Sequence, residues 1–510
     1  MSDFQTKEEA TGSSPVISST KILREKGEKM ENNFEYKEEY GWITSVCLNV
    51  TDACNLACRY CFVEQHPHYM TLDIAKQAVH FILDNLEKKN KQNEKQNRAS
   101  ITYFGGEPTI MWDEIIIPLT NYIRENNFPI NLNMTTNGTL LNKERIEFMK
   151  NNNINPLLSI DGDRKTQEYN RPCHNSNQSS FDLVEKNIPD LLDAFPNLTF
   201  RSTIYADTVE NTFKNYVFAM EQGFKNIFMI PDGRHSWTEE KRKILYNEFN
   251  KIFALQTNLF ENNIYSINYS LLNEAYTQAL QLIQPNYNLE LNVKRGINRC
   301  GLGITGASVS WDGKIYGCQE QPSFGKDDIF YIGDLNQGID KEKHKHLLSV
   351  YNTKGISKCN NIEQCETCLL RKICVGFGCP SFSWDLYKNF LILEETQCSW
   401  REHMAANAIA SINYLLNQNN KIFIKYMKKN YDSSRPIIQE SELFKDKEKW
   451  NELINEIETN YNNIMNDNEM LSAYDDIYKQ LKDFPNAKSN YIYKNILNLV
   501  KKAEIPLPKL

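Results

Sequence analysis

Residues 42–61 read WITSVCLNVTDACNLACRYC, an apolar run followed at once by three cysteines. The apolar run, at 42–50, has the composition of a strand. Cys54, Cys58 and Cys61 follow it with C-x3-C-x2-C spacing. Three soft ligands on one short loop suit an iron–sulfur cube, and they leave one iron open to a small molecule. A zinc knuckle is the alternative, although zinc favours four ligands in C-x2-C pairs.

The strand at 42–50 begins a regular alternation of strand-like and helix-like segments. Strand-like runs lie at 42–50, 100–104, 130–136, 156–160, 198–205 and 226–230. The clearest helical pattern between them is 71–87, and the polar stretch 88–98 reads as an exposed loop. This order predicts an α/β fold, a partial (β/α)6 TIM-like barrel of parallel strands. Catalytic groups should then lie on loops at the carboxyl ends of the strands, where the cysteine loop is found.

Composition excludes several classes of function. The chain has 510 residues, with 58 basic and 65 acidic side chains and no long basic stripe, so we expect no nucleic-acid partner. It contains neither a long apolar run nor a secretory segment, so we expect a cytoplasmic protein without a membrane partner. In that compartment its 13 cysteines favour metal ligands over disulfides.

Glycine-containing turns end the next three predicted strands. They read YFGGEP at 103–108, MTTNG at 134–138 and LSIDG at 158–162. Glycines allow the backbone to approach a ligand closely. Such turns are common after strands, but their occurrence on consecutive βα loops indicates one shared binding site.

With these motifs in place, residues 40–235 resemble the radical S-adenosylmethionine (SAM) enzymes. In that family three cysteines hold a [4Fe–4S] cluster whose open iron is chelated by the methionine amino and carboxylate groups. Reduction then produces a 5′-deoxyadenosyl radical that abstracts hydrogen. The resemblance implies that Cys54, Cys58 and Cys61 bind the cluster, and that SAM is contacted by Tyr60, Gly105, Gly106, Glu107, Ser159 and Arg171. Arg171 would hold the methionine carboxylate, which suits its bidentate geometry.

A second set of cysteines follows between residues 300 and 398. The set of seven comprises Cys300, Cys318, Cys365, Cys368, Cys374, Cys379 and Cys398. The Trp311-Asp312-Gly313 turn predicts a β-hairpin that brings Cys300 and Cys318 together. Seven thiols exceed one tetrahedral site, and a double zinc ribbon is the structural alternative.

This arrangement resembles the SPASM domain, which holds two auxiliary [4Fe–4S] clusters in its family. One departure is that four residues, 375–378, separate the last two cysteines of the central run where the family has three. By resemblance the first auxiliary cluster takes Cys300, Cys318 and Cys379, and the second takes Cys365, Cys368, Cys374 and Cys398. Cys359 is a candidate fourth ligand of the first; otherwise that iron is open to a substrate thiolate. Cys47, in the apolar strand, reads as a small buried core residue.

Four segments are therefore predicted. They are a disordered tail at 1–38, a radical SAM partial barrel at 39–287, a SPASM domain at 288–404 and a helical C-terminal extension at 405–510. Helical patterns at 405–416 and 447–466 define the extension.

Two branches of the radical SPASM group bear on the reaction. Anaerobic sulfatase maturases place an Asp base directly after the cysteine of G-x4-C, where this chain has Gln319. An amide is no base, and Glu320 would point to the other face of a strand. The stretch at 61–70 instead resembles maturases that form thioethers in Cys-rich ribosomal peptides. In that reading a carbon radical forms on an acceptor residue, the cysteine sulfur adds, and an auxiliary cluster accepts the electron.

Thioether formation in a precursor peptide is thus the predicted activity. Formylglycine formation, C–C crosslinking and a zinc-stapled binding protein are the alternatives. His66 and His68 are candidates for proton transfer, although a surface-loop role is favoured. The resemblance implies a leader-bearing precursor peptide and a flavodoxin- or ferredoxin-type electron donor as partners. Because 38 residues are too few for a folded leader-binding domain, leader recognition is assigned to the C-terminal extension or to a separate protein.

Overall fold

The structure is a computed structural model. It describes residues 35–92, 97–175, 177–264, 268–284, 301, 303–321, 328–351, 358–359, 368–373, 379–389, 392–393, 395–428, 441–459 and 491–508. Nearly all of the predicted tail at 1–38 lies outside these ranges. Its last residues are placed, and the Tyr36 hydroxyl lies 3.0 Å from Nδ1 of His344.

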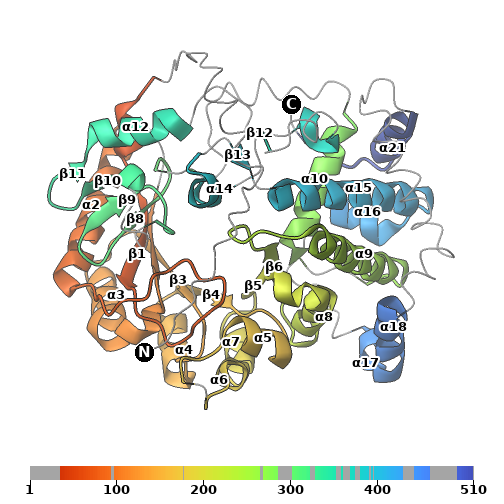
Figure 1. Ribbon diagram of the computed structural model, residues 1–510, viewed down its shortest axis with the longest axis horizontal. Helices are drawn as coiled ribbons and strands as arrows, with labels where there is room; N and C mark the ends of the chain where they lie inside the picture. Colours follow the sequence, from red (N-terminus) through yellow and green to blue (C-terminus); the bar gives the residue numbers. More distant parts are fainter. Residues whose placement is uncertain are drawn as a thin grey trace, which may run out of the picture.

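The six predicted strands all form and pair in chain order. They are β1 (Ser45–Thr51), β2 (Ala99–Gly105), β3 (Ile130–Thr136), β4 (Ile154–Ser159), β5 (Thr199–Ile204) and β6 (Asn226–Pro231). Each pairs with its neighbour in parallel, and a short β7 (Asn268–Tyr269) continues beyond β6 in the same direction. Figure 1 shows the helices that connect them on the outside of this arc of strands. The predicted parallel α/β core is confirmed.

Connecting helices follow the strands in the predicted alternation. They are α2 (Leu72–Lys91), α3 (Ile117–Glu125), α4 (Lys143–Asn151), α5 (Arg164–Asn170), α6 (Ser180–Glu185), α7 (Ile188–Ala194), α8 (Thr212–Glu221), α9 (Glu239–Glu261) and α10 (Ser270–Leu282). Side chains cap several of them at the first turn; Thr71, for example, accepts from the Ile74 amide at 3.3 Å.

Helix α2 extends beyond the predicted end of its pattern. The stretch expected to be loop from residue 88 remains helical as far as Lys91. Lys91 pairs with Glu87 one turn earlier at 2.6 Å, and three lysines occupy the last turn, where the helix dipole favours cations. The polar character of these residues therefore marks an exposed helix end, and the loop prediction is wrong as far as residue 91.

The cysteine-rich region adds strands to the same sheet. They are β8 (Ala307–Val309), β9 (Lys314–Tyr316), β10 (Tyr331–Asp334) and β11 (Gly338–Ile339). β8 and β9 form the predicted hairpin, and β8 pairs in parallel with β1. The complete order is β11-β10-β9-β8-β1-β2-β3-β4-β5-β6-β7. Because β8 runs parallel to β1, the turn between β8 and β9 lies at the edge of the sheet where the cysteine loop emerges from β1.

The remaining elements are mostly helical. They are η1 (Glu38–Gly41), η2 (Pro108–Met111), η3 (Trp112–Ile116), η4 (Ala206–Asn211), η5 (Asp328–Phe330), η6 (Leu369–Lys372), α12 (Lys341–Tyr351), α14 (Pro380–Tyr387), α15 (Glu395–Asn417), α16 (Lys421–Met427), α17 (Glu442–Lys445), α18 (Lys447–Thr459) and α21 (Tyr491–Lys502), with β12 (Lys358–Cys359) parallel to β13 (Ile392–Leu393). Helix α15 crosses the predicted boundary at residue 404 and packs on α9, α10 and α21.

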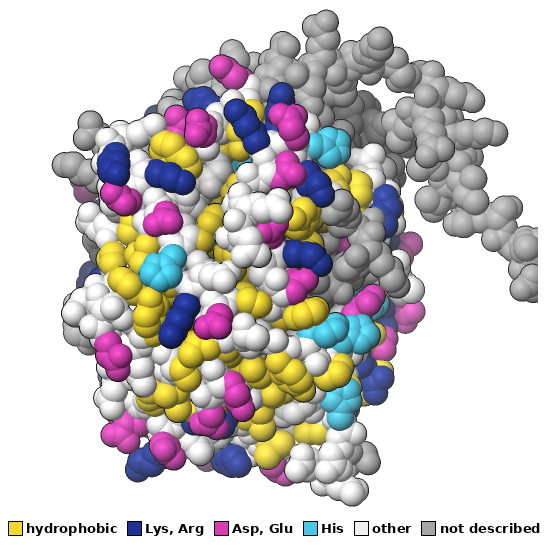
Figure 2. All heavy atoms as spheres, turned by 90° about the vertical axis from the view of Figure 1, so that its left-hand side faces the viewer, with side chains coloured by type: hydrophobic (Ala, Val, Ile, Leu, Met, Phe, Trp, Pro, Cys, Tyr) yellow, Lys and Arg dark blue, Asp and Glu magenta, His cyan; other side chains and the backbone are white. Residues whose placement is uncertain are grey.

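Charges of both signs cover the outer face of the sheet. In Figure 2, acidic and basic side chains alternate over the side that carries α2, α3 and β8–β11, with hydrophobic side chains between them. None of the helices in the described ranges is both long and apolar enough to cross a bilayer.

Trp450 anchors helix α18 to the helices outside the parallel sheet. Its side chain is fully buried, its Nε1 donates to Glu221 of α8 at 2.8 Å, and its ring contacts Phe444 edge-on at 5.1 Å. Helix α18 also packs on α9, so Trp450 joins the extension to the outer helical layer.

We expect Trp450→Ala to release α17 and α18 from the barrel. Loss of a buried tryptophan costs about 3–5 kcal/mol, most of it local to this contact. Hydrogen exchange and limited proteolysis should show lower protection across 441–459. Trp450→Phe is the matched control, because it removes the hydrogen bond and keeps most of the packing. Unchanged protection in the alanine variant would show that other contacts hold the extension.

Candidate functional site

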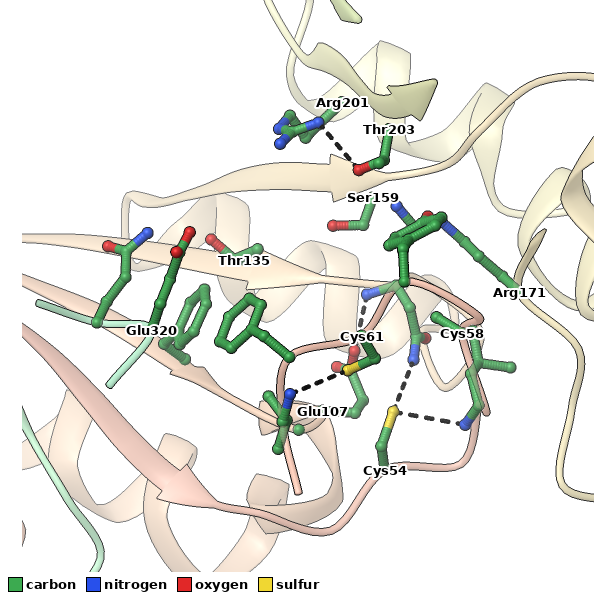
Figure 3. Close-up of a pocket in the computed structure, with 18 of the residues that line it drawn as sticks. Cys54, Cys58, Cys61, Glu107, Thr135, Ser159, Arg171, Arg201, Thr203 and Glu320 are labelled. Carbon is green, nitrogen blue, oxygen red and sulfur yellow. Dashed lines mark hydrogen bonds between the residues drawn. The ribbon is translucent and has the colours of Figure 1, made fainter. Parts of the chain in front are cut away.

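A cavity of about 240 Å³ opens at the carboxyl ends of the parallel strands. Its walls come from the cysteine loop after β1, the ends of β2 to β6, the turn after β9 and Phe382 of α14. Figure 3 shows side chains from these elements converging on one space. The cavity lies where the predicted barrel places catalytic groups.

The three cysteines of the first motif all line this cavity. All are free thiols, and the loop folds back so that backbone amides approach two of the sulfurs. The Leu56 amide donates to Cys54 Sγ and the Val63 amide to Cys61 Sγ, each at 3.4 Å. Amide donors to sulfur stabilise thiolate ligands and tune the potential of iron–sulfur clusters.

Burial keeps these thiols protonated when they carry no metal. It raises the pKa of Cys58 to about 12 and also raises the pKa of Cys54 and Cys61. Metal binding would therefore release their protons, because only the thiolate is a ligand. In the described ranges no three His, Cys, Asp or Glu side chains converge as they do around a single ion. A [4Fe–4S] cube binds each cysteine at a different iron and does not require that the thiols converge on one ion.

Gly105 and Gly106 bring the second loop against the cysteine loop. The Gly106 amide donates to the Thr51 carbonyl at 2.8 Å, and the Glu107 amide donates to the Ala53 carbonyl at 2.9 Å. A Cβ on Gly106 would stand 2.2 Å from the Ala53 carbonyl oxygen, and one on Gly105 would stand 2.2 Å from that of Thr51. Glycine is required at both positions because any side chain would strike backbone.

The Glu107 carboxylate is buried, and most of its hydrogen-bonding capacity is used by groups of the protein. Oε1 accepts from the Thr109 amide at 3.1 Å, the Thr109 hydroxyl at 2.5 Å and the Thr136 hydroxyl at 2.8 Å. Oε2 accepts from the Asn137 amide at 2.7 Å. Oε2 accepts only this one hydrogen bond in the described residues, which leaves it a lone pair for an ammonium group. Burial raises the pKa of Glu107, and these donors oppose the rise.

Arg171 is held in the cavity wall by Asp161. Its Nη2 lies 3.0 Å from Asp161 Oδ1, its guanidinium stands 5.4 Å from the Tyr60 ring centroid, and Tyr60 in turn donates its hydroxyl to Asp161. Burial opposes the charge on Arg171, but Asp161 raises its pKa well above the ordinary value. Nε of Arg171 is buried without a partner in this protein-only structure. Arg171 also approaches Cys58, where its charge counteracts part of the burial effect on the thiol pKa.

All the sequence-predicted SAM contacts therefore lie together. Tyr60, Gly105, Gly106, Glu107, Ser159 and Arg171 line the same cavity as the three cysteines. Their placement agrees with the predicted roles, which themselves remain predictions. The three thiols of the cavity suit an iron–sulfur cluster. The glycine loop, Glu107 and Arg171 suit the amino and carboxylate groups of an amino acid beside it.

The far wall contains residues that the sequence motifs did not identify. Arg201 and Thr203 of β5 face the cavity, and Asp232 and Arg234 follow β6. Arg234 lies over the rings of Phe62 and Phe382 at 4.7 and 4.6 Å. These residues occupy the ends of the fifth and sixth strands, so strand position was the only signal available in the sequence.

The turn after β9 contradicts one detail of the sequence interpretation. Gln319 and Glu320 lie in a turn, since β9 ends at Tyr316, and both side chains line the cavity. Glu320 therefore does not point away, as strand alternation would require. Its carboxylate pairs with Arg234 at 2.6 Å. Gln319 Oε1 accepts from the Cys47 thiol at 3.1 Å, so Cys47 is partly exposed and contacts the site, contrary to a purely core role.

His66 and His68 lie outside the cavity lining. His68 Nδ1 is 3.1 Å from the Asp52 carboxylate, and the His68 ring stacks on Trp311 at 4.3 Å. His66 is exposed beside Glu64. The His68 contacts tie the cysteine loop to the β8–β9 hairpin, which favours the surface-loop interpretation.

The second cysteine set is described only in part. Cys318 follows β9, Cys368 and Cys379 precede η6 and α14, and Cys398 lies within α15. Cys300, Cys365 and Cys374 lie outside the described residues, as does the side chain of Cys359. The two auxiliary clusters remain a prediction.

The glycine-built cradle, the free thiols and the buried Arg171–Asp161 pair are the features expected of a radical SAM site. Residues 48–217 match the Radical SAM superfamily, so this third of the chain is a radical SAM domain. It is 24% identical over 389 residues to the radical SAM cyclopropyl synthase TigE of Paramaledivibacter caminithermalis, across 74% of this chain and 75% of TigE. It is also 24% identical over 340 residues to the cysteine-type anaerobic sulfatase-maturating enzyme of Clostridium novyi, across 64% of this chain and 84% of that enzyme.

Solved structures share the fold. Native anSMEcpe with bound AdoMet and Cp18Cys peptide matches with a TM-score of 0.56 and 21% sequence identity, over 73% of this chain and 99% of that chain. The likeness in fold extends past β6. It covers 73% of this chain, which is more than all the residues up to the end of β6.

We expect Gly106→Ala to weaken SAM binding. The added methyl group would displace the loop from the Ala53 carbonyl and shift the groups assigned to the amino acid moiety, a misplacement that costs about 10- to 100-fold. Equilibrium dialysis of reconstituted enzyme with SAM measures the effect. Gly41→Ala is the control, because its Cβ would meet nothing closer than 3.6 Å. Equal SAM affinity in the two variants would contradict the assigned cradle.

Proposed function

We propose that this enzyme modifies a ribosomally made precursor peptide and forms thioether bonds from cysteine sulfur to carbon. The observation that carries the proposal is the single cavity that joins the cysteine loop and the predicted SAM contacts to a second, differently lined wall. A neighbour of the same fold holds AdoMet and the Cp18Cys peptide together, and a sequence relative of this chain is a cysteine-type anaerobic sulfatase-maturating enzyme. The far wall would then receive the peptide.

The residues have distinct proposed roles. When bound, the cluster and SAM supply a 5′-deoxyadenosyl radical that abstracts a hydrogen atom. Glu107 Oε2 and the glycine loop hold the methionine amino group, and Arg171 holds the carboxylate in bidentate fashion. Ser159 lies toward the ribose and the Tyr60 ring toward the adenine. Asp161 keeps Arg171 in position and neutralises it.

Thioether formation is preferred over formylglycine formation because of Gln319. Formylglycine maturases need a base at that position, and Gln319 Oε1 is instead engaged by the Cys47 thiol. The similarity to a cyclopropyl synthase supports C–C bond formation as the second candidate. Both candidate reactions remove hydrogen from the peptide and use no added oxygen.

The auxiliary clusters and partners belong to the same proposal. Cys300, Cys318 and Cys379, with Cys359 as the candidate fourth ligand, would hold one cluster, and Cys365, Cys368, Cys374 and Cys398 the other. The hairpin that carries Cys318 pairs with β1, so such a cluster would lie close to the peptide wall and could accept an electron from it. A flavodoxin- or ferredoxin-type donor would supply reduction, and the C-terminal extension or a separate protein would bind the leader.

We expect the triple variant Cys54→Ala, Cys58→Ala, Cys61→Ala to lose 5′-deoxyadenosine formation entirely. Three clusters correspond to about twelve irons per chain, and the variant should retain about two thirds of them. Iron assay and chromatography after dithionite reduction provide both readouts. Cys173→Ala is the matched control, because Cys173 is a free thiol on a neighbouring loop outside the cavity lining. Zinc without iron after anaerobic reconstitution would contradict the enzyme assignment.

Mass spectrometry of a coexpressed Cys-rich peptide tests the bond type. A thioether removes the elements of H2 per link and also consumes a thiol, so iodoacetamide should label one cysteine fewer per link. A C–C bond gives the same mass loss with every cysteine still labelled. An aldehyde product would favour formylglycine formation and contradict the reading of Gln319.

A further inference from the structure

Two of the three arginines that line the cavity are paired with carboxylates in the described residues, and the third is an exception. Arg171 pairs with Asp161 at 3.0 Å. Arg234 pairs with Glu320 at 2.6 Å and with Asp385 at 3.3 Å. These two arginines therefore bring their own counter-charges into the wall.

Arg201 is the exception. Its Nη1 donates to the Ser202 carbonyl and lies 3.5 Å from the Thr203 hydroxyl, and its guanidinium stands 4.8 Å from the Phe228 ring centroid. Within the residues that the structure describes, no carboxylate lies within ion-pair distance of it. Burial lowers the pKa of Arg201 and repulsion from Arg171 lowers it further, while the more distant Asp161 and Glu320 carboxylates offset only part of this effect. A partly buried cation without an anion is costly, and an anionic ligand would remove that cost.

The acids near the cavity are already engaged by other groups. Asp161 pairs with Arg171 and Glu320 with Arg234. Glu107 accepts four hydrogen bonds from Thr109, Thr136 and Asn137. Asp232 accepts from His235 Nδ1 at 2.5 Å. The wall around Arg201 is therefore rich in donors and poor in available acceptors.

Arg201 is also separate from the arginine assigned to SAM. Arg171 approaches Cys58 and lies on the cluster side of the cavity. Figure 3 shows Arg201 and Thr203 on the side of the cavity away from Cys54, with Ser159 between them and the cysteine loop. One carboxylate on SAM is satisfied by Arg171, which leaves Arg201 for a second anion.

We propose that Arg201, with Thr203, binds a carboxylate of the peptide substrate. This inference rests on the proposed function and adds to it that an Asp or Glu side chain, or the peptide C-terminus, stands beside the reacting residue. The guanidinium can present its remaining N–H groups as a bidentate fork, and the Thr203 hydroxyl can donate a further hydrogen bond. Gln319 extends the donor wall, because its Oε1 is engaged by Cys47 and its amide N–H groups remain to bind a peptide carbonyl.

Selection from a peptide library tests this subsite without knowledge of the natural substrate. The reconstituted holoenzyme, saturated with SAM, is immobilised anaerobically and panned with short peptides randomised around one fixed cysteine. Wild-type enzyme should enrich Asp or Glu at one position by about tenfold, as expected for a charge-assisted bidentate contact. Arg201→Gln should lose this enrichment, and Arg201→Glu should replace it with Lys or Arg.

Two further variants make the result interpretable. Arg201→Lys keeps the charge but not the fork, so it should retain a weakened acidic preference. Arg164→Gln makes the same chemical change at an exposed arginine of α5 that pairs with Glu168 and Asp182, and it should select as wild type does. Iron content and circular dichroism confirm that each variant is folded.

Three outcomes would overturn the assignment. Peptides enriched around the cysteine without any acidic position would contradict the carboxylate subsite while leaving the proposed function intact. Loss of SAM affinity in Arg201→Gln would assign this guanidinium to the cofactor carboxylate. Failure of the wild-type holoenzyme to enrich any peptide would contradict both the subsite and the peptide substrate.

Discussion

The buried carboxylate of Asp161 joins the parts of the site that the chain brings from separate strands. Oδ2 accepts from the Tyr60 hydroxyl on the cysteine loop, and Oδ1 from Arg171 and from the Thr203 amide of β5. Asn170 adds a fourth donor at 3.1 Å. Without this carboxylate the Arg171 charge would be buried unpaired, a cost of several kcal/mol. This side chain links the cluster loop to the fourth and fifth strands, and backbone hydrogen bonds from Ala57 to Pro172 and from Arg59 to Asn170 hold the same loop.

A second constraint is the close backbone contact between the first two loops. Gly105 and Gly106 allow the end of β2 to hydrogen-bond to the residues just before Cys54, which places Glu107 beneath the cysteine loop. Glu107 is then held by the end of β3. Around this edge of the sheet, each loop is therefore positioned by contacts with the next loop. Strand pairing, the two glycines and the buried carboxylates provide these contacts.

Prediction from the sequence succeeded where the pattern of apolar residues along the chain corresponds directly to a strand or a helix. All six strands were located, because apolar runs bounded by turns mark buried parallel strands, and the three motif loops met as expected at their ends. It failed where tertiary or end effects decide. The polar end of α2 was read as loop, and Glu320 was placed on a strand that ends at Tyr316. The lysine-rich end of a helix and the end of a short hairpin strand both lack a regular spacing of apolar residues that would mark them in the sequence.

The sequence by itself determined the chemistry of the cluster side. Three thiols at fixed spacing, paired glycines and a loop arginine are each recognisable, because the ligand requires those residue types in that local order. Only the tertiary structure decided the composition of the opposite wall. Arg201, Arg234 and Gln319 come from three elements far apart in the chain, and none lies in a motif. Which side chains meet across the cavity depends on the tertiary structure. It pairs Arg234 with Glu320 and leaves Arg201 without an ion pair in the described residues.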